Sequence, residues 1–183
     1  MGLGMPEDTA LGYTLTARIL HWVTAALVLT MIPIGIAMAN ADFGPAQDVL
    51  YHLHRSIGAV LLPIVVLRLL YRLRHSTPPL PADIPAIQQL AAHATHWALY
   101  ALLIVQPIAG WIATSAYRAP ILVFWLFELP PIWPVDQPFS ENAFAVHRLL
   151  GIAIALLLCA HIGAALFHHF IRKDRVLMRM VSG

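Results

Sequence analysis

Long apolar stretches alternate with short polar links along the chain. The apolar stretches cover residues 15–39, 49–73, 87–116 and 145–170, and few charged side chains interrupt them. About 20 consecutive apolar residues are enough for an α-helix to cross the hydrocarbon core of a membrane. The pattern therefore predicts an all-α integral membrane protein: a four-helix up-and-down bundle that forms a single domain over residues 1–183.

The links between the apolar stretches differ in character. Residues 40–48 carry aspartate but no basic residue, and the link H-S-T-P-P-L-P-A-D-I-P is rich in proline, which predicts a rigid connection. The longest link, residues 117–142, mixes aromatic residues with prolines, as is typical of a segment at the membrane interface. Residues 1–13 lack the charged start of a signal peptide, and Thr14 or Thr16 is expected to cap the first helix.

Composition supports a membrane protein and narrows its chemistry. The chain is 60% hydrophobic and 11% charged, whereas soluble domains contain about 25% charged residues. Its mean hydropathy is +0.74, and its pI of about 9.0 reflects a few interfacial basic residues rather than a nucleic-acid-binding surface. The single cysteine, Cys159, excludes an intramolecular disulfide and a cysteine-bound iron–sulfur cluster.

Basic residues are distributed unequally between the two sides of the predicted membrane. One side carries Arg18, Arg68, Arg72, Arg74, Arg172, Lys173, Arg175 and Arg179. The other side carries Arg55, Arg118 and Arg148 together with the acidic Asp42, Asp48, Glu128, Asp136 and Glu141. Because cytoplasmic loops are enriched in Lys and Arg, both termini are expected to face the cytoplasm.

The ten histidines are the anomaly in so apolar a chain. An ionisable residue inside a membrane span marks a functional site by default: a metal or haem ligand, a proton relay or a helix–helix hydrogen bond. His147 and His161 lie in the last apolar stretch. Fourteen residues of helix separate them by about 21 Å and leave them within about 40° of one face. This spacing suggests one axial ligand for each of two stacked haems.

Depth identifies the partners of these two histidines. If each span is centred in the bilayer, His21 lies about 9 Å toward the cytoplasm and His54 about 12 Å toward the outside. Their separation matches that of His147 and His161, so the predicted pairs are His21 with His161 (inner) and His54 with His147 (outer). Replacing His161 by His168 would demand about 31 Å, which fits worse.

The other polar residues near the spans leave alternatives open. His52 points away from His54 and is expected to contact interfacial solvent, and His75 is expected in a solvated loop. His93 and His96 are either interfacial hydrogen-bonding residues or part of a proton-coupled quinone site, which His168 or His169 could also line. Arg55 and Arg148 each follow an outer ligand, and they either pair with haem propionates or act as interfacial anchors.

An ordered set of motifs runs through the chain. It comprises R-I-L-H-W, H-L-H-R-S-I-G-A, L-R-L-L-Y-R-L-R-H-S-T-P-P-L-P, A-A-H-A-T-H-W-A-L-Y, F-E-L-P-P, A-V-H-R-L-L-G and A-H-I-G-A-A-L-F-H-H-F-I-R-K-D. With this set, the chain resembles the bacterial cytochrome b561 family, four-helix proteins of the inner membrane with two haem b groups. The resemblance implies the same four axial ligands, His21, His54, His147 and His161.

The resemblance also implies quinone-linked oxidoreductase activity. Some family members oxidise periplasmic superoxide and reduce ubiquinone. The family often has an acidic residue after the outer histidine of the fourth span, and here it is Arg148, whose charge is expected to attract an anion such as superoxide. The alternative is a membrane-anchor cytochrome b subunit that passes electrons between a periplasmic redox partner and quinone.

Overall fold

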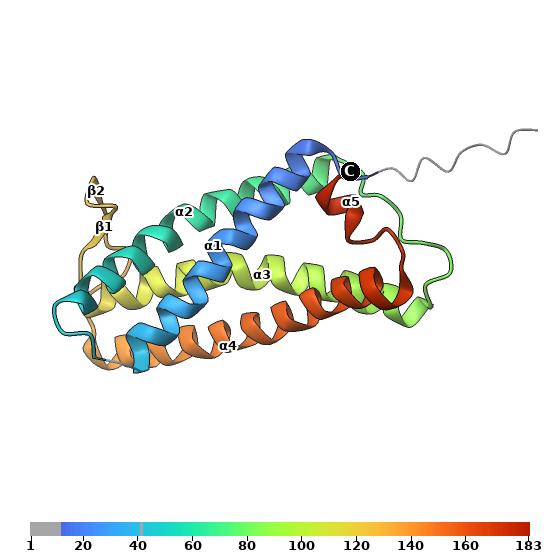
Figure 1. Ribbon diagram of the computed structural model, residues 1–183. Coiled ribbons are helices and arrows are strands. Elements are labelled where there is room, and N and C mark those ends of the chain that lie inside the picture. The colour runs from blue at the N-terminus through green and yellow to red at the C-terminus, as the bar shows by residue number, and fades with distance from the viewer. Residues whose placement is uncertain (1–11, 41) are drawn as a thin grey trace, which may run out of the picture.

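Four long helices dominate the computed structural model, which describes residues 12–40 and 42–183 (Figure 1). In chain order the helices and strands are α1 (Leu15–Asn40), α2 (Ala46–Arg74), α3 (Ala86–Tyr117), β1 (Ile121–Val123), β2 (Phe127–Leu129), α4 (Gln137–Phe167), the π-helical turn η1 (His168–Arg172) and α5 (Met178–Val181). The four long helices are each apolar and long enough to cross a membrane. The predicted all-α membrane bundle is therefore confirmed.

The helix ends follow local capping chemistry. Thr14, one of the two expected caps, accepts a hydrogen bond from the backbone N–H of Ala17 at 3.3 Å. At α4 the Asp136 carboxylate accepts from the N–H of Phe139 at 3.0 Å, with Pro138 in the first turn. This helix thus begins at Gln137, within the segment that the sequence predicted to be a connection. Its first turns are polar, so hydropathy alone does not reveal them.

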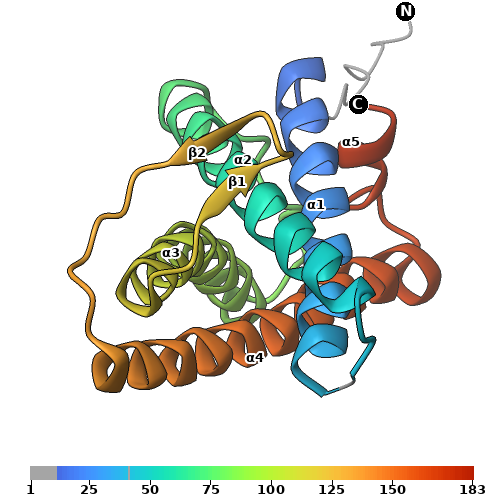
Figure 2. The same ribbon diagram turned by 90° about the vertical axis from the view of Figure 1, so that its left-hand side faces the viewer.

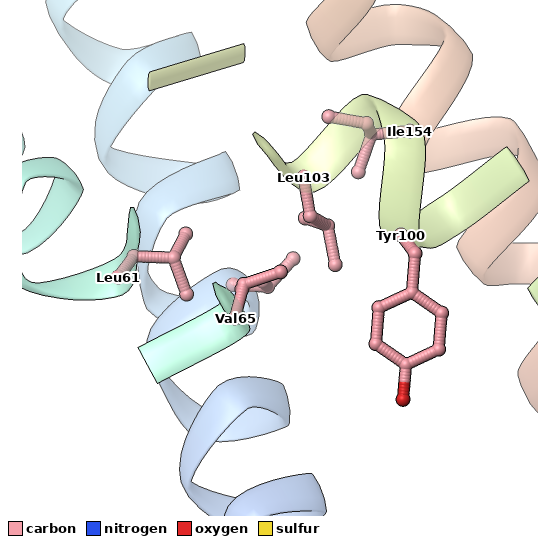
Figure 3. Close-up of a cluster of buried hydrophobic side chains, with 6 residues drawn as sticks. Leu61, Val65, Tyr100, Leu103 and Ile154 are labelled. Atoms are coloured by element: carbon pink, nitrogen blue, oxygen red, sulfur yellow. The ribbon is translucent and has the colours of Figure 1, made fainter. Parts of the chain in front are cut away.

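The long helices pack mainly against their neighbours in sequence. Contacts are extensive between α1 and α2, α2 and α3, and α3 and α4, whereas α4 makes few with α1 or α2. Buried apolar side chains from all four long helices form one cluster: Val28, Leu61, Val65, Tyr100, Leu103 and Ile154. Figure 3 shows the last five of them close together. On α4, however, only Ser140 and Ile154 are fully buried. The side of α4 that faces α1 and α2 is therefore loosely packed.

A small β-hairpin lies across one end of the bundle (Figure 2). Strands β1 and β2 are antiparallel, and Val123 pairs with Phe127. Ser56 of α2 fastens the hairpin, because its buried hydroxyl donates to the carbonyl of Leu122 at 3.1 Å and accepts from the N–H of Phe124 at 2.8 Å. The expected interfacial link is thus an ordered hairpin followed by the start of α4.

Both ends of the described chain meet at the opposite end of the bundle (Figure 1). The N–H of Tyr13 donates to the carbonyl of Arg179 at 3.1 Å. Trp22 Nε1 donates to the carbonyl of Met180 at 3.0 Å, and Arg18 donates to the carbonyl of Val181. We call this the terminal end and the other the hairpin end. Residues 1–11, part of the expected polar lead-in, lie outside the described residues.

Candidate functional site

At the terminal end, α1 and α4 each direct a histidine toward the interior of the bundle. The ring centroids of His21 and His161 are 6.2 Å apart, with an angle of 61° between the ring planes. Both side chains are half-buried. The structure thus brings together the two residues that the depth argument paired.

At the hairpin end, a second pair joins α2 to α4. The ring centroids of His54 and His147 are 6.1 Å apart, with an interplanar angle of 77°. The pair lies beneath the hairpin, since Arg55, next to His54, donates to the carbonyl of Pro120 at 3.0 Å. The two pairs have nearly the same spacing although they join different helices.

Residue Gln106 of α3 orients one ring of the hairpin-end pair. His147 Nδ1 lies 3.0 Å from the backbone carbonyl oxygen of Gln106. Because a carbonyl only accepts, Nδ1 must carry the proton, and Nε2 keeps its lone pair. Metal-bound histidines are commonly held in this way, with the second N–H donated to a carbonyl. His147 therefore has the tautomer that an Nε2 ligand needs, and its Nε2 lies 3.3 Å from the side-chain nitrogen of Gln106, a contact that a bound metal would replace.

Two glycines make room for the hairpin-end pair. A Cβ atom at Gly110 would lie 2.9 Å from Cε1 of His147, and one at Gly35 would lie 3.2 Å from Cε1 of His54. His54 Nδ1 is buried and has no hydrogen-bond partner within the described part of the chain. The sequence marked Gly35 only as a possible bend in the first helix, and it did not mark Gly110 or Gln106, which resemble ordinary helix residues.

A small cavity of about 50 Å³ lies beside the terminal-end pair. Its wall comes from all four long helices and consists of His21, Thr24, Ala25, Val28, Arg68, His96, Leu99, Tyr100, Leu103, Ile154, Leu158 and His161. Arg68 Nη2 is 2.8 Å from His21 Nδ1. The cavity lies on the loosely packed side of α4, next to Ile154, Leu158 and His161.

The structure separates His93 from His96, which the sequence grouped together. His93 is exposed, and its Nδ1 lies 2.7 Å from the carbonyl oxygen of Gln89, as expected for an interfacial residue. His96 instead lines the cavity, with its ring centroid 5.3 Å from that of His161. Interfacial hydrogen bonding is therefore wrong for His96, because α3 continues past it toward the terminal end and places it at the depth of His161.

The remaining histidines lie away from the two pairs. His52 packs against Trp125 of the hairpin, with 5.6 Å between ring centroids, rather than facing only solvent. His75 is exposed and stacks on Tyr71. His169 contacts Phe170, whereas His168 Nδ1 lies 2.5 Å from a carboxylate oxygen of Asp174.

Asp174 is the centre of an ionic cluster beyond the end of α4. Burial alone would raise the pKa of its carboxyl, but hydrogen bonds from His168, the N–H of Val176 and Arg172 outweigh burial and lower the pKa below its usual value. Arg172 also reaches Asp83 in the proline-rich link at 2.6 Å. The cluster thus ties the chain after α4 to the segment between α2 and α3.

Comparison with known sequences decides the family. The sequence pattern described as prokaryotic cytochrome b561 matches residues 12–183. The chain belongs to this family. As a cytochrome b561 it is a multi-pass oxidoreductase of the bacterial inner membrane, which uses haem b to transfer electrons across the membrane.

Several relatives are similar over nearly their whole length. The chain is 36% identical over 175 residues to cytochrome b561 homolog 2 of Escherichia coli (strain K12), covering 93% of this chain and 91% of the relative. It is 32% identical over 168 residues to the probable superoxide oxidase CybB of Yersinia pestis, covering 88% and 91%. It is 29% identical over 178 residues to cytochrome b562 of Cereibacter sphaeroides, covering 93% and 95%.

Proposed function

We propose that this cytochrome b561 holds two haem b groups, one between His21 and His161 and one between His54 and His147. The main support is the spacing of the pairs, whose ring centroids are 6.2 and 6.1 Å apart. Two imidazoles bound to opposite faces of one metal ion at about 2 Å each have centroids roughly 6 Å apart. The centroid spacing of both pairs meets this requirement.

The ligand count also favours haem over a bare metal ion. Among residues 12–40 and 42–183, no group of three or more His, Cys, Asp or Glu side chains is arranged to hold a metal. A metal at either pair must therefore bring most of its own ligands, as the four porphyrin nitrogens of haem do. The small cavity at the terminal end and the glycines at the hairpin end mark where such a flat group would lie beside each pair.

The chain would contribute position and environment to this chemistry. Haem iron, when bound, supplies the one-electron redox step. With two histidines holding each haem, no iron position would remain open for direct binding of oxygen. Helix α4 contributes one ligand to each site, and the two lie about 21 Å apart along it. The two sites would therefore lie at different depths in the membrane and allow an electron to pass from one haem to the other.

We propose that electrons pass from a one-electron donor on the periplasmic side to ubiquinone, with both termini in the cytoplasm. The unequal distribution of basic residues supports this orientation. Superoxide is the proposed donor, because the relative in Yersinia pestis is named as a probable superoxide oxidase. Arg148 supports an anionic donor, since it is exposed next to His147. Arg55 and Arg148 are also proposed propionate contacts of the hairpin-end haem.

Purified protein in ubiquinone-containing vesicles tests this function. We expect superoxide loss that depends on ubiquinone, and Arg148→Glu should slow the reaction several-fold at low salt and reduce its salt dependence. Arg74→Glu, a charge change at the terminal end, serves as the matched control. No superoxide loss by protein that carries both haems would rule out superoxide as the donor, and an unchanged rate in Arg148→Glu would rule out steering by this residue.

The second candidate function is a membrane-anchor cytochrome b subunit that exchanges electrons between a periplasmic redox protein and quinone. The hairpin tip favours it, because Leu126 is 81% exposed and Phe124 and Trp125 are also exposed. Exposed apolar patches of this kind mark protein or membrane contacts. Co-purification with a periplasmic redox protein, lost in Leu126→Asp, would support the anchor function.

A further inference from the structure

Two arginines of α2 lie one helical turn apart beside the terminal-end pair. Arg68 lines the cavity, and Arg72 follows four residues later on the same face. Their guanidinium carbons lie 5.2 and 5.6 Å from the ring centroid of Tyr100, and that of Arg72 is also 5.7 Å from the ring centroid of Trp97. Both side chains are half-buried. Two positive charges are thus held together inside a predicted membrane span.

No carboxylate of the described residues neutralises these two charges. The salt bridges in this part of the chain join His168 to Asp174 and Arg172 to Asp83 and Asp174. Burying a guanidinium without an anion costs free energy, and in a membrane such residues normally pair. The aromatic rings of Tyr100 and Trp97 offset part of this cost through cation–π contacts. The described residues therefore supply no anion to these two guanidinium groups.

The hydrogen bond between Arg68 and His21 indicates that Arg68 needs another acceptor once His21 binds a metal. Arg68 has only donors, so His21 Nδ1 must accept at 2.8 Å and Nε2 carries the proton. A neutral histidine that binds a metal through Nε2 has its proton on Nδ1, and Nδ1 then cannot accept from Arg68. If Nδ1 itself binds the metal, its lone pair is equally lost. Either mode of ligation by His21 frees Arg68 for another acceptor.

We propose that Arg68 and Arg72 bind the propionate carboxylates of the haem held by His21 and His161. This inference rests on the proposed function. A haem brings two carboxylates, which match the two guanidinium groups, and arginine binds carboxylates in bidentate geometry. Arg68 then exchanges its bond to His21 for a carboxylate oxygen as the site is loaded. The same positive charges favour the reduced form of that haem and make this end of the bundle the better electron acceptor.

The arginine at the hairpin end has different partners from Arg68 and Arg72. Arg55 follows His54 in sequence, but its guanidinium donates to the carbonyl of Pro120 and lies 5.5 Å from the ring centroid of Tyr51. A propionate contact of Arg55 would therefore share this guanidinium with the hairpin, whereas neither Arg68 nor Arg72 donates to a backbone carbonyl within the described residues. The difference between the two ends predicts a higher midpoint potential at the terminal end, and so electron flow toward the side on which quinone is proposed to react.

The test uses the intact protein carrying haem with ¹³C-labelled propionate carboxylates. We expect the labelled carboxylate bands in the reduced-minus-oxidised infrared spectrum to shift in Arg68→Gln, and one of two midpoint potentials to fall. Arg72→Gln, farther from His21, should produce the same changes to a smaller degree, and Arg68→Lys should restore part of the potential. Arg74→Gln, an exposed arginine of the same helix, is the control and should leave bands and potentials unchanged.

Unchanged labelled bands in Arg68→Gln and Arg72→Gln, with two haems present, would overturn the inference and leave the proposed function intact. A loss of bound phospholipid from these variants, with unchanged propionate bands, would identify the anion as a lipid phosphate and would also overturn it. Absence of haem from the wild-type protein would overturn the inference together with the proposed function.

Discussion

Two glycines on different helices face the two histidines of the hairpin-end pair. Gly35 of α1 lies against His54, and Gly110 of α3 lies against His147. At each position the missing side chain lets an imidazole approach the neighbouring helix. Small residues commonly allow such close approach between membrane helices, and here they also set where the rings lie. The position of a proposed ligand thus depends on residues that carry no chemistry of their own.

Gly110→Ala tests this dependence. The new methyl group would lie 2.9 Å from His147 Cε1, so the ring must move, and overpacking of this kind costs about 1–3 kcal/mol. We expect the haem content to fall from about two per chain toward one and His54→Ala to cause no further loss. Gly163→Ala, whose methyl group would meet no atom within 4 Å, is the matched control. Equal haem content in the two alanine variants would contradict the assigned role of Gly110.

At the scale of elements, one hydroxyl fastens the hairpin to the bundle. Ser56 is fully buried and bonds both to the Leu122 carbonyl and to the Phe124 N–H. The turn that follows contains Phe124 and Trp125 at positive φ, 46° and 59°, a strained conformation for bulky residues. The hairpin conformation therefore depends on this attachment, and the hairpin covers the end of the bundle that holds His54 and His147.

Ser56→Ala should release the hairpin. Two backbone groups lose their partner, at a cost of about 1–3 kcal/mol, and the contact between Trp125 and His52 loosens with them. We expect faster proteolysis within residues 119–135 and a red-shifted tryptophan emission, while Ser182→Ala at the terminal end leaves both unchanged. If cleavage in Ser56→Ala is no faster than in the wild type, other contacts hold the hairpin.

The Asp174 cluster makes the C-terminal tail sensitive to acid. The folded-state pKa of Asp174 is below its ordinary value of 3.8, so the stabilisation is fully present above about pH 4. It is lost as pH falls through the lower folded value. We expect hydrogen exchange in residues 175–183 to show pH-independent protection above this range and to lose protection below it. Asp174→Asn should show the weaker protection at every pH, and equal protection in both proteins at pH 7 would contradict the assignment.

The sequence was sufficient to predict those features that depend on a long apolar stretch or on the spacing of residues along one helix. Hydropathy placed the four long helices, and helical rise paired His21 with His161 and His54 with His147, which lie together in the structure. The sequence was insufficient for features whose position depends on contacts with another helix. The cavity position of His96 depends on how α3 packs against α4, and the hairpin depends on Ser56 rather than on strand periodicity. Asp136 and Pro138 do signal the start of α4, but its first turns are polar and conceal it from hydropathy.

At the scale of the whole molecule, the two ends of the bundle differ in chemical character. The terminal end gathers the basic tail and the ends of α2 and α4, whereas the hairpin end exposes apolar and aromatic side chains. In the proposed orientation the terminal end faces the cytoplasm, so electrons travel from the hairpin end inward. The loosely packed side of α4 is then the region in which both proposed haems would be held.

Reporter fusions test this orientation. A fluorescent protein that folds only in the cytoplasm should be bright when fused after Gly183, and alkaline phosphatase, which needs the periplasm, should be inactive there. Insertion of each reporter within the hairpin-end link between Asp42 and Ala46 should give the opposite result. The reverse pattern at both positions would place the termini outside and reverse the proposed direction of electron flow.

The most direct test of the two-haem arrangement is a reduced-minus-oxidised absorption spectrum of the purified protein with its haem content per chain. Since each histidine pair would hold one haem, we predict about two b-type haems in the wild type and about one in each of His54→Ala and His161→Ala. His93→Ala, an exposed histidine outside both pairs, should retain both haems. A wild-type protein without haem, or a haem content that neither ligand substitution changes, would contradict the assignment of the two pairs.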